Sequence, residues 1–221
     1  MRRASVRDGR STAAGPGQRG RSGPEGAEAT SAGRRRSFEA LSEEIRRCTR
    51  CPLSQSRTHA VVYRGSLEPR VVFVGEAPGA EEDRQGVPFV GRSGRLLDRA
   101  VGTLGPALGA YGVLNVLKCR PPANRFDPRA ARTCRPYLVR QLELLRPQLL
   151  VPLGAKALAA LDPASPPILR AAGIVRQGMF GRTFPLIHPA AALRSRRLRE
   201  RWEHDVGALG AWLSGSVLET L

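Results

Sequence analysis

The chain has 221 residues, 41% of them hydrophobic, which suits one folded domain with a buried core and hardly two. Its formal net charge of +17 is carried almost wholly by arginine, since Lys118 and Lys156 are the only lysines. Such a charge favours a polyanionic partner, because contacts to phosphates release counterions. An arginine-rich coding bias is the alternative explanation. No apolar run approaches the roughly 20 residues of a membrane helix, and no secretory signal is present. We therefore expect no membrane partner and a cytoplasmic, nucleoid-associated protein.

The first 36 residues are rich in Gly, Ser, Ala and Arg and show no periodic apolar pattern. This composition predicts a disordered, Arg-rich tail over residues 1–36, followed by a single domain over residues 37–221. The tail either adds loose affinity for nucleic acid or reflects a misassigned start. From Ser37, apolar residues recur at helical spacing, which predicts a short helix leading into Cys48.

Strand-like and helix-like segments alternate along the rest of the chain. Four short β-rich runs are expected as strands: Val71–Gly75, Gly112–Val116, Leu149–Leu153 and Thr183–Ile187. Helices are expected over Ser93–Leu104 (with Ser93 as N-cap and Gly105 following it), Pro136–Leu145, Ala155–Leu161 and 198–213. This alternation predicts an α/β fold in which helices cover both faces of a parallel sheet.

Three polar residues stand where the predicted strands end. Glu76 follows the first strand, Asn115 lies near the end of the second, and His188 follows the fourth. Ligands of open parallel sheets bind outside the carboxyl ends of the strands. These side chains are therefore candidates for one shared site.

The four cysteines are Cys48, Cys51, Cys119 and Cys134, and without a secretory signal they favour metal binding or catalysis over disulfides. A C-x2-C pair directs two thiolates at one centre, and two more from distant segments would complete a four-sulfur site. Zinc and a 4Fe-4S cluster both accept four thiolates, and unrelated buried thiols remain a third alternative. The wide spacing of the second pair suits a bulky cluster somewhat better. Either metal would have a structural role, joining the first helix to the segment after the second strand.

Two motifs at the first strand carry a family resemblance. The string Gly75-Glu76-Ala77-Pro78-Gly79-Ala80-Glu81-Glu82-Asp83, with Gly86-Val87-Pro88-Phe89-Val90-Gly91, resembles the first active-site motif of family 4 (iron–sulfur, type A) uracil-DNA glycosylases. The segments Asn115–Pro122 and His188–Arg194 resemble that family's second-strand and closing motifs, and the four cysteines match its 4Fe-4S ligands. The resemblance runs in order from about Cys48 to Arg194. It implies a three-layer α/β/α fold with a central four-stranded parallel sheet.

The resemblance also implies an activity. Such an enzyme is a monofunctional hydrolase that flips uracil out of DNA and cuts its N-glycosidic bond, which starts base excision repair. Phe89 would stack on the base, Asn115 would read its edge, and His188 would donate to O2. Glu76 would orient water or stabilise the sugar cation, or would be only positional, with the backbone at Ala77 holding the base.

Three further residues receive weaker expectations from the same resemblance. Glu82 would lie near uracil C5 and help exclude the methyl group of thymine. Leu193 would wedge into the duplex, and Arg194 would meet a phosphate. The expected partner is uracil-containing DNA, and the protein is expected to be a monomer.

Three other hypotheses stay open at this point. A related DNA-crosslinking branch carries Gln after the motif's Glu and a histidine after the second strand, but this chain has Ala77 and a segment Arg120–Arg125 without histidine. A non-catalytic nucleic-acid-binding metalloprotein would keep only the scaffold. A zinc-braced, Rossmann-like nucleotide enzyme is disfavoured because the first strand lacks the G-x-G-x-x-G fingerprint.

Overall fold

The computed structural model describes residues 30–215. Its helices precede, connect and follow the strands: α2 Ser31–Arg46, α3 Leu53–Ser56, α4 Ala80–Gln85, α5 Arg92–Leu104, η1 Gly105–Ala107, η2 Pro122–Asn124, α6 Pro128–Leu145, α7 Ala155–Leu161, α8 Ile168–Ala171, α9 Pro189–Ala192 and α10 Arg196–Leu213. The strands are β1 Arg64–Gly65, β2 Val71–Gly75, β3 Tyr111–Asn115, β4 Leu149–Pro152, β5 Arg176–Gly178 and β6 Gly181–Thr183. None of the helices within residues 30–215 is both long and apolar enough to cross a membrane.

One sheet contains all of these strands, in the order β1-β3-β2-β4-β6-β5. The inner strands β3, β2, β4 and β6 are parallel, which confirms the expected four-stranded parallel core. The short strands β1 and β5 add antiparallel edges that the sequence did not predict. The chain stays paired with β4 beyond the end of β6. The N–H groups of Phe184 and Leu186 donate to carbonyls of β4 at 2.8 and 2.9 Å. The predicted fourth strand therefore continues β6 along the sheet.

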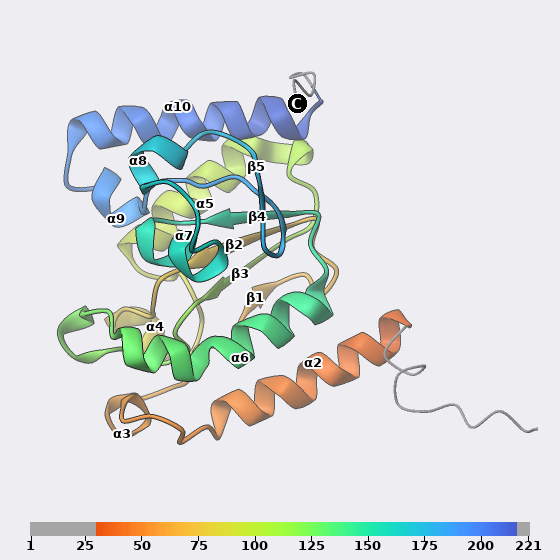
Figure 1. Cartoon of the computed structure of the whole chain (residues 1–221), viewed down its shortest axis with the longest axis vertical. Helices are drawn as coiled ribbons and strands as arrows, with labels where there is room; N and C mark the ends of the chain where they lie inside the picture. The colour runs from red at the N-terminus through yellow and green to blue at the C-terminus, as the bar shows by residue number, and fades with distance from the viewer. Residues whose placement is uncertain (1–29, 216–221) are drawn as a thin grey trace, which may run out of the picture.

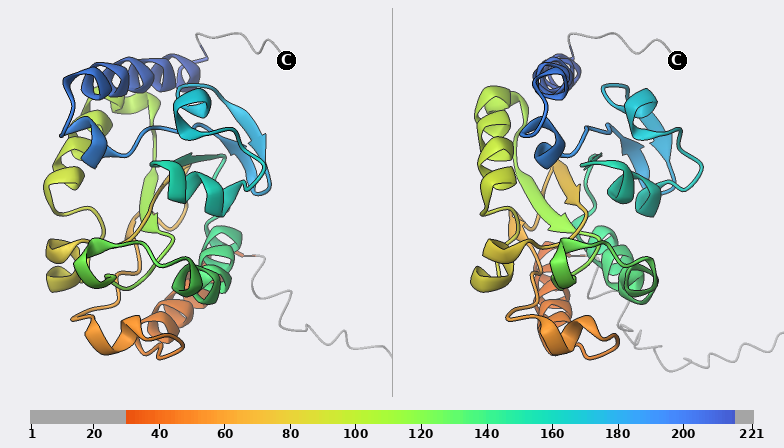
Figure 2. Two further views of the ribbon diagram at one scale, coloured as in Figure 1. Left: turned by 60° about the vertical axis from the view of Figure 1, so that its left-hand side comes forward. Right: turned by 90° about the vertical axis from the view of Figure 1, so that its left-hand side faces the viewer.

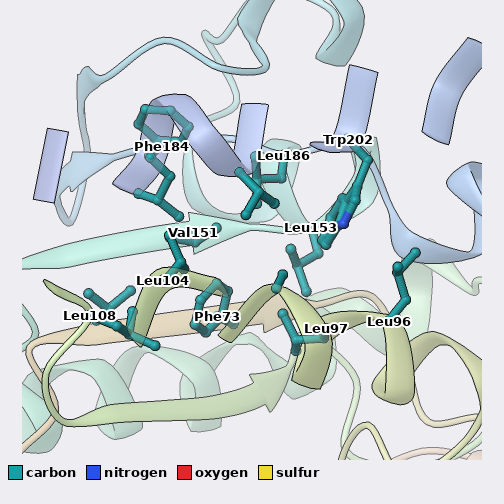
Figure 3. Packing of buried hydrophobic residues seen from close by; sticks show 14 of the residues in the cluster. Phe73, Leu96, Leu97, Leu104, Leu108, Val151, Leu153, Phe184, Leu186 and Trp202 are labelled. Atoms are coloured by element: carbon teal, nitrogen blue, oxygen red, sulfur yellow. The ribbon is translucent and has the colours of Figure 1, made fainter. Parts of the chain in front are cut away.

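Helices cover both faces of the sheet, as the alternating pattern predicted (Figure 1). Alternate residues of β2 point to opposite sides: Val71 and Phe73 pack toward α5 and α10, whereas Val72 and Val74 pack toward α2, α6 and α7. Figure 3 shows the first of these cores, in which Phe73 of β2 and Val151 of β4 share one cluster with Leu97 of α5 and Trp202 of α10. Strands buried on both faces explain why their sequences are continuous hydrophobic runs.

The first helix begins earlier than expected and corrects the predicted tail boundary. It starts at Ser31, where the Thr30 side chain accepts a hydrogen bond from the Gly33 N–H. Residues 31–36 are thus helical, and residues 1–29 of the predicted tail lie outside the described part of the chain. The helix α2 packs along α6, and Figure 2 shows this pair from two sides with α3 close by.

Two other helix starts also differ from the predictions. The N-cap of α5 is Gly91 rather than Ser93, and the N-cap residue makes no side-chain hydrogen bond to the helix. The helix α6 begins at Pro128, capped by the Asp127 carboxylate, so Pro136 lies inside it instead of starting it. A proline often marks a helix start because it lacks an N–H, and the sequence offers two that could do so.

Candidate active site

A cleft of about 590 Å³ opens at the carboxyl ends of the parallel strands. It brings together the residues that the sequence placed at these ends. They come from the end of β3 and from the segments that follow β2 and β6, and all of them line the cleft: Glu76, Ala77, Glu82, Phe89, Asn115, His188 and Arg194. The expected convergence of these segments on one cavity is therefore observed.

Asn115 ends β3 and is 1% exposed. Neither polar atom of its side chain, Oδ1 or Nδ2, has a hydrogen-bond partner within residues 30–215. Its register partner across the sheet is Gly75. A Cβ on Gly75 would lie 2.3 Å from Asn115 Oδ1 and 2.4 Å from the ring of Phe89. The glycine therefore provides the space in which the amide and the aromatic ring meet.

Phe89 lies in the loop between α4 and α5 and has a positive φ of 58°. Residues other than glycine seldom adopt this conformation, and it costs of order 1–3 kcal/mol unless the surroundings enforce it. Glu82 supplies that enforcement, since its carboxylate accepts hydrogen bonds from the N–H groups of Val90 (3.0 Å), Gly91 (2.8 Å) and Gly79 (3.0 Å). Glu82 thus fixes the loop that holds Phe89. Its proximity to a uracil C5 atom stays a prediction.

His188 is the N-cap of α9, and its Nδ1 accepts a hydrogen bond from the Ala190 N–H at 3.1 Å. In a neutral imidazole the proton must then be on Nε2, which makes Nε2 a donor. Burial lowers the pKa of His188 to about 4, helped by the positive charge of Arg194 and opposed by Glu82. The ring lies 6.2 Å from that of Phe89, centroid to centroid. His188 is therefore a neutral donor at the cleft under physiological conditions.

Gly154, two residues after the end of β4, makes room for this histidine. It has a φ of 89°, and a Cβ there would lie 2.9 Å from the Cβ of His188. Sequence reasoning missed both Gly75 and Gly154. The available signal was a glycine at the carboxyl end of two predicted strands, where a close approach of another side chain is common.

Glu76 and Ala77 follow β2 and line the cleft. Burial raises the pKa of Glu76 above its ordinary value, and the positive charge of Lys156 opposes this shift. Ala77 also packs against the cluster formed by Leu53, Leu117, Cys119 and Ala130. The carboxyl end of β2 thus contacts both the cleft and the cysteine-bearing segments.

The two predicted DNA-contacting residues differ in position. Arg194 is exposed and lines the cleft. Leu193 is half-buried, packs against the core shared with α5 and α10, and does not line the cleft. Three lining residues lie outside the motifs that predicted the site: Arg92, Ser93 and Asn124.

The four cysteines line a second cavity between α2, α3, α6 and the segment after β3. Within residues 30–215, no three His, Cys, Asp or Glu side chains converge closely enough to hold a single metal ion. Cationic groups lie around the thiols: Arg57 donates to Cys119 Sγ at 2.9 Å, and Lys118 acts on Cys134 by its charge and its backbone N–H. Burial raises the pKa of Cys119 and Cys134, whereas these cationic neighbours lower it.

Comparisons with known proteins agree with this geometry. Residues 62–206 match the family model described as "Uracil DNA glycosylase superfamily". The chain is 41% identical over 162 residues to a type-4 uracil-DNA glycosylase of Thermotoga maritima, covering 72% of this chain and 84% of that protein. It is 39% identical over 194 residues to the type-4 enzyme of Archaeoglobus fulgidus, covering 84% and 97%. The family-model match begins after Cys48 and Cys51. By these similarities the chain belongs to the uracil-DNA glycosylase superfamily, within its type-4 branch.

Proposed function

We propose that this protein is a monofunctional uracil-DNA glycosylase that flips uracil out of DNA and hydrolyses its N-glycosidic bond at the start of base excision repair. One observation carries the proposal. Asn115 holds an amide without protein partners in the same cleft as Phe89 and His188. Leaving such a polar group buried and unsatisfied costs about 1–3 kcal/mol, so a ligand that pairs with it recovers that cost.

The amide of Asn115 matches the edge of uracil. Its Oδ1 can accept from N3–H while its Nδ2 donates to O4. With the amide held in this orientation, both of its atoms would stay unpaired against cytosine, which has an acceptor at N3 and a donor at the exocyclic amine. A site built to hydrogen-bond one substrate can reject an analogue that lacks the match by about 10⁴–10⁵-fold. Stacking on Phe89 would add about 1–3 kcal/mol for any planar base.

His188 would stabilise the leaving group. Negative charge develops on uracil O2 as the bond to the sugar breaks, and the neutral Nε2–H is available to donate to it. The proton stays on Nε2 because Nδ1 already accepts from Ala190. A fixed donor in a site with little water is typically worth about 3–4 kcal/mol.

Glu76 has two possible contributions at the cleft. Its carboxylate could orient the attacking water or stabilise the positive charge that develops on the sugar. Its half-buried position and the nearby charge of Lys156 agree with either contribution. The backbone at Ala77 would hold the base beside it.

Contacts to DNA outside the cleft would come from the α9–α10 region. Enzymes that act on a base in a duplex must extrude it, and an apolar side chain that fills the gap offsets part of the unstacking cost. We propose Leu193 for this wedge and Arg194 for a phosphate contact. The wedge requires Leu193 to leave its present packing against the core. A substrate of this kind would keep the enzyme at the nucleoid.

We further propose that Cys48, Cys51, Cys119 and Cys134 hold a 4Fe-4S cluster. The four thiols surround one cavity, and cationic donors adjoin two of them, as a site for thiolates requires. The assignment follows from the resemblance of these four cysteines to the cluster ligands of family 4 glycosylases. When bound, the cluster would act as a structural brace that ties α2 and α3 to α6 and the segment after β3.

The direct test uses one uracil in a labelled duplex. Purified protein that shows absorbance near 400 nm, roughly as iron–sulfur proteins do, should release free uracil and leave an alkali-labile site. Duplexes with cytosine or thymine at the same position are the matched controls and should stay intact. An intact uracil duplex after alkali treatment would refute the proposed activity.

A further inference from the structure

Lys118 is a buried lysine that the proposed mechanism does not use. It is 1% exposed and lies three residues after Asn115 and directly before Cys119. Its Nζ donates a hydrogen bond to the backbone carbonyl of Asn115. Its own carbonyl accepts from the Val61 N–H at 2.7 Å. The lysine therefore closes the turn that follows β3 directly behind the base-reading residue.

The cysteines lie next to the same side chain. Lys118 lines the same cavity as Cys48, Cys51, Cys119 and Cys134. The backbone N–H of Lys118 also bonds to Cys134. A buried ammonium is costly unless an anion lies nearby, and metal binding keeps thiols deprotonated. The loaded cysteine site would thus supply the countercharge that Lys118 needs.

The backbone contacts of Asn115 bear on the direction of its side chain. Its side chain has no protein hydrogen bond within residues 30–215 that could fix its direction. Its orientation must then come from packing and from its main chain. The main chain is held on one side by the Val116 N–H to the Gly75 carbonyl at 2.9 Å, and on the other by Lys118.

From this chain of contacts we propose that Lys118 is a positioning residue that couples the metal centre to uracil recognition. The thiolates hold the ammonium, the ammonium holds the Asn115 carbonyl, and the carbonyl sets the amide that reads the base. The inference rests on the proposed function and deepens it, because it makes base discrimination depend on the cysteine site.

A double-mutant cycle tests the coupling. Lys118→Met removes the charge and the donor at similar volume. It should lower kcat/KM on uracil DNA at least about tenfold, because residues in direct contact couple by up to a few kcal/mol. In an Asn115→Ala background the same substitution should have almost no further effect. An equal loss in both backgrounds would mean that Lys118 acts independently of Asn115, and the proposal would fail.

A second readout does not depend on turnover. Affinity is compared for duplexes carrying either 2′-fluoro-2′-deoxyuridine, which resists hydrolysis, or the matching 2′-fluoro-cytidine. Lys118→Met should lower the uracil-over-cytosine ratio about tenfold while iron content and absorbance per protein are kept. The matched control is Arg57→Met, since Arg57 contacts Cys119 and the Arg46 carbonyl but not Asn115. It should lose iron faster and yet keep the ratio in the loaded protein.

Two outcomes separate the possible failures. If both variants lose the ratio only in proportion to lost iron, Lys118 is merely part of the metal site and the coupling is refuted. If the wild type itself shows no preference for uracil, the proposed function fails instead. Should Lys118→Met not fold, Lys118→Gln takes its place in the same cycle: it removes the charge, so it should still lower kcat/KM on uracil DNA and have almost no further effect in the Asn115→Ala background.

Discussion

The cleft and the cysteine cavity lie at the same end of the sheet, but they differ in whether their polar groups already have partners. In the cleft, the Asn115 amide is buried with no partner and Phe89 is held at a positive φ. In the cysteine cavity, donors and charges already surround the thiols, from Arg57 on Cys119 to Lys118 on Cys134. The unpaired amide suits a substrate that binds and leaves, whereas the thiols with donors beside them suit a group that stays bound. The comparison teaches that two cavities at one end of the sheet can differ in kind, one holding an unpaired amide and the other holding thiols with donors beside them.

The largest expected effect comes from removing the unpaired amide. Asn115→Ala should lower kcat/KM on uracil DNA by about 10⁴-fold, because the base loses both edge contacts. The midpoint of urea unfolding should stay the same or rise, since the substitution deletes two buried atoms without partners. Single-turnover rates and unfolding curves measure the two quantities. A large loss of stability would show that the amide is paired in the native protein.

The second effect concerns the leaving-group donor. His188→Asn should keep the N-cap of α9, because an asparagine oxygen can accept from the Ala190 N–H as Nδ1 does now. It should remove the Nε2–H donor and slow the single-turnover rate by about 10²–10³-fold. Binding of the hydrolysis-resistant uracil duplex should change little. A variant that cleaves at the wild-type rate would exclude His188 from the reaction.

The same pair of proteins gives a prediction about pH and stability. The folded pKa of His188 is about 4 and lies below its unfolded value of 6.5, so protons bind preferentially to the unfolded state. The stability due to neutral His188 is complete above pH 6.5 and is lost as the pH falls toward 4. Across this window the wild type should lose about 3 kcal/mol more than His188→Asn. Urea unfolding at matched pH values measures the difference, and parallel curves would refute the burial of a neutral imidazole.

The smallest effect is expected at the exposed rim of the cleft. Arg194→Ala should weaken DNA binding a few-fold and reduce the slope of log K against log salt by about 1, as expected for one lost phosphate contact. The uracil-over-cytosine ratio should not change. Arg199→Ala, on the same helical region but outside the cleft lining, is the control. An altered ratio in Arg194→Ala would mean that this residue reads the base.

Much of the scaffold could be predicted from the sequence because strands buried on both faces leave an unmistakable apolar run. The run Val71–Gly75 was predicted with the bounds that β2 has in the structure. The edge strands β1 and β5, of two and three residues, are too short to leave a pattern. The predicted start of α5 was wrong because its N-cap, Gly91, donates its N–H to the carboxylate of Glu82, nine residues earlier in the chain.

The sequence predicted which residues line the cleft, but not the hydrogen bonds that hold them there. Strand ends and family motifs placed Glu76, Asn115 and His188 in one cleft. They could not show that Glu82 is occupied by three backbone N–H groups, or that Lys118 reaches back to Asn115. Those contacts join residues only three to nine positions apart, but they depend on the path of the loop backbone, which hydrophobic periodicity does not encode.

The most direct test of the central claim is a crystal structure of the loaded protein with free uracil. The account predicts the ring against Phe89, with N3 and O4 within hydrogen-bond distance of Asn115 Oδ1 and Nδ2, and O2 within that distance of His188 Nε2. A structure in which uracil binds elsewhere, or in which the Asn115 amide is bonded to protein groups while the base sits in the cleft, would contradict it.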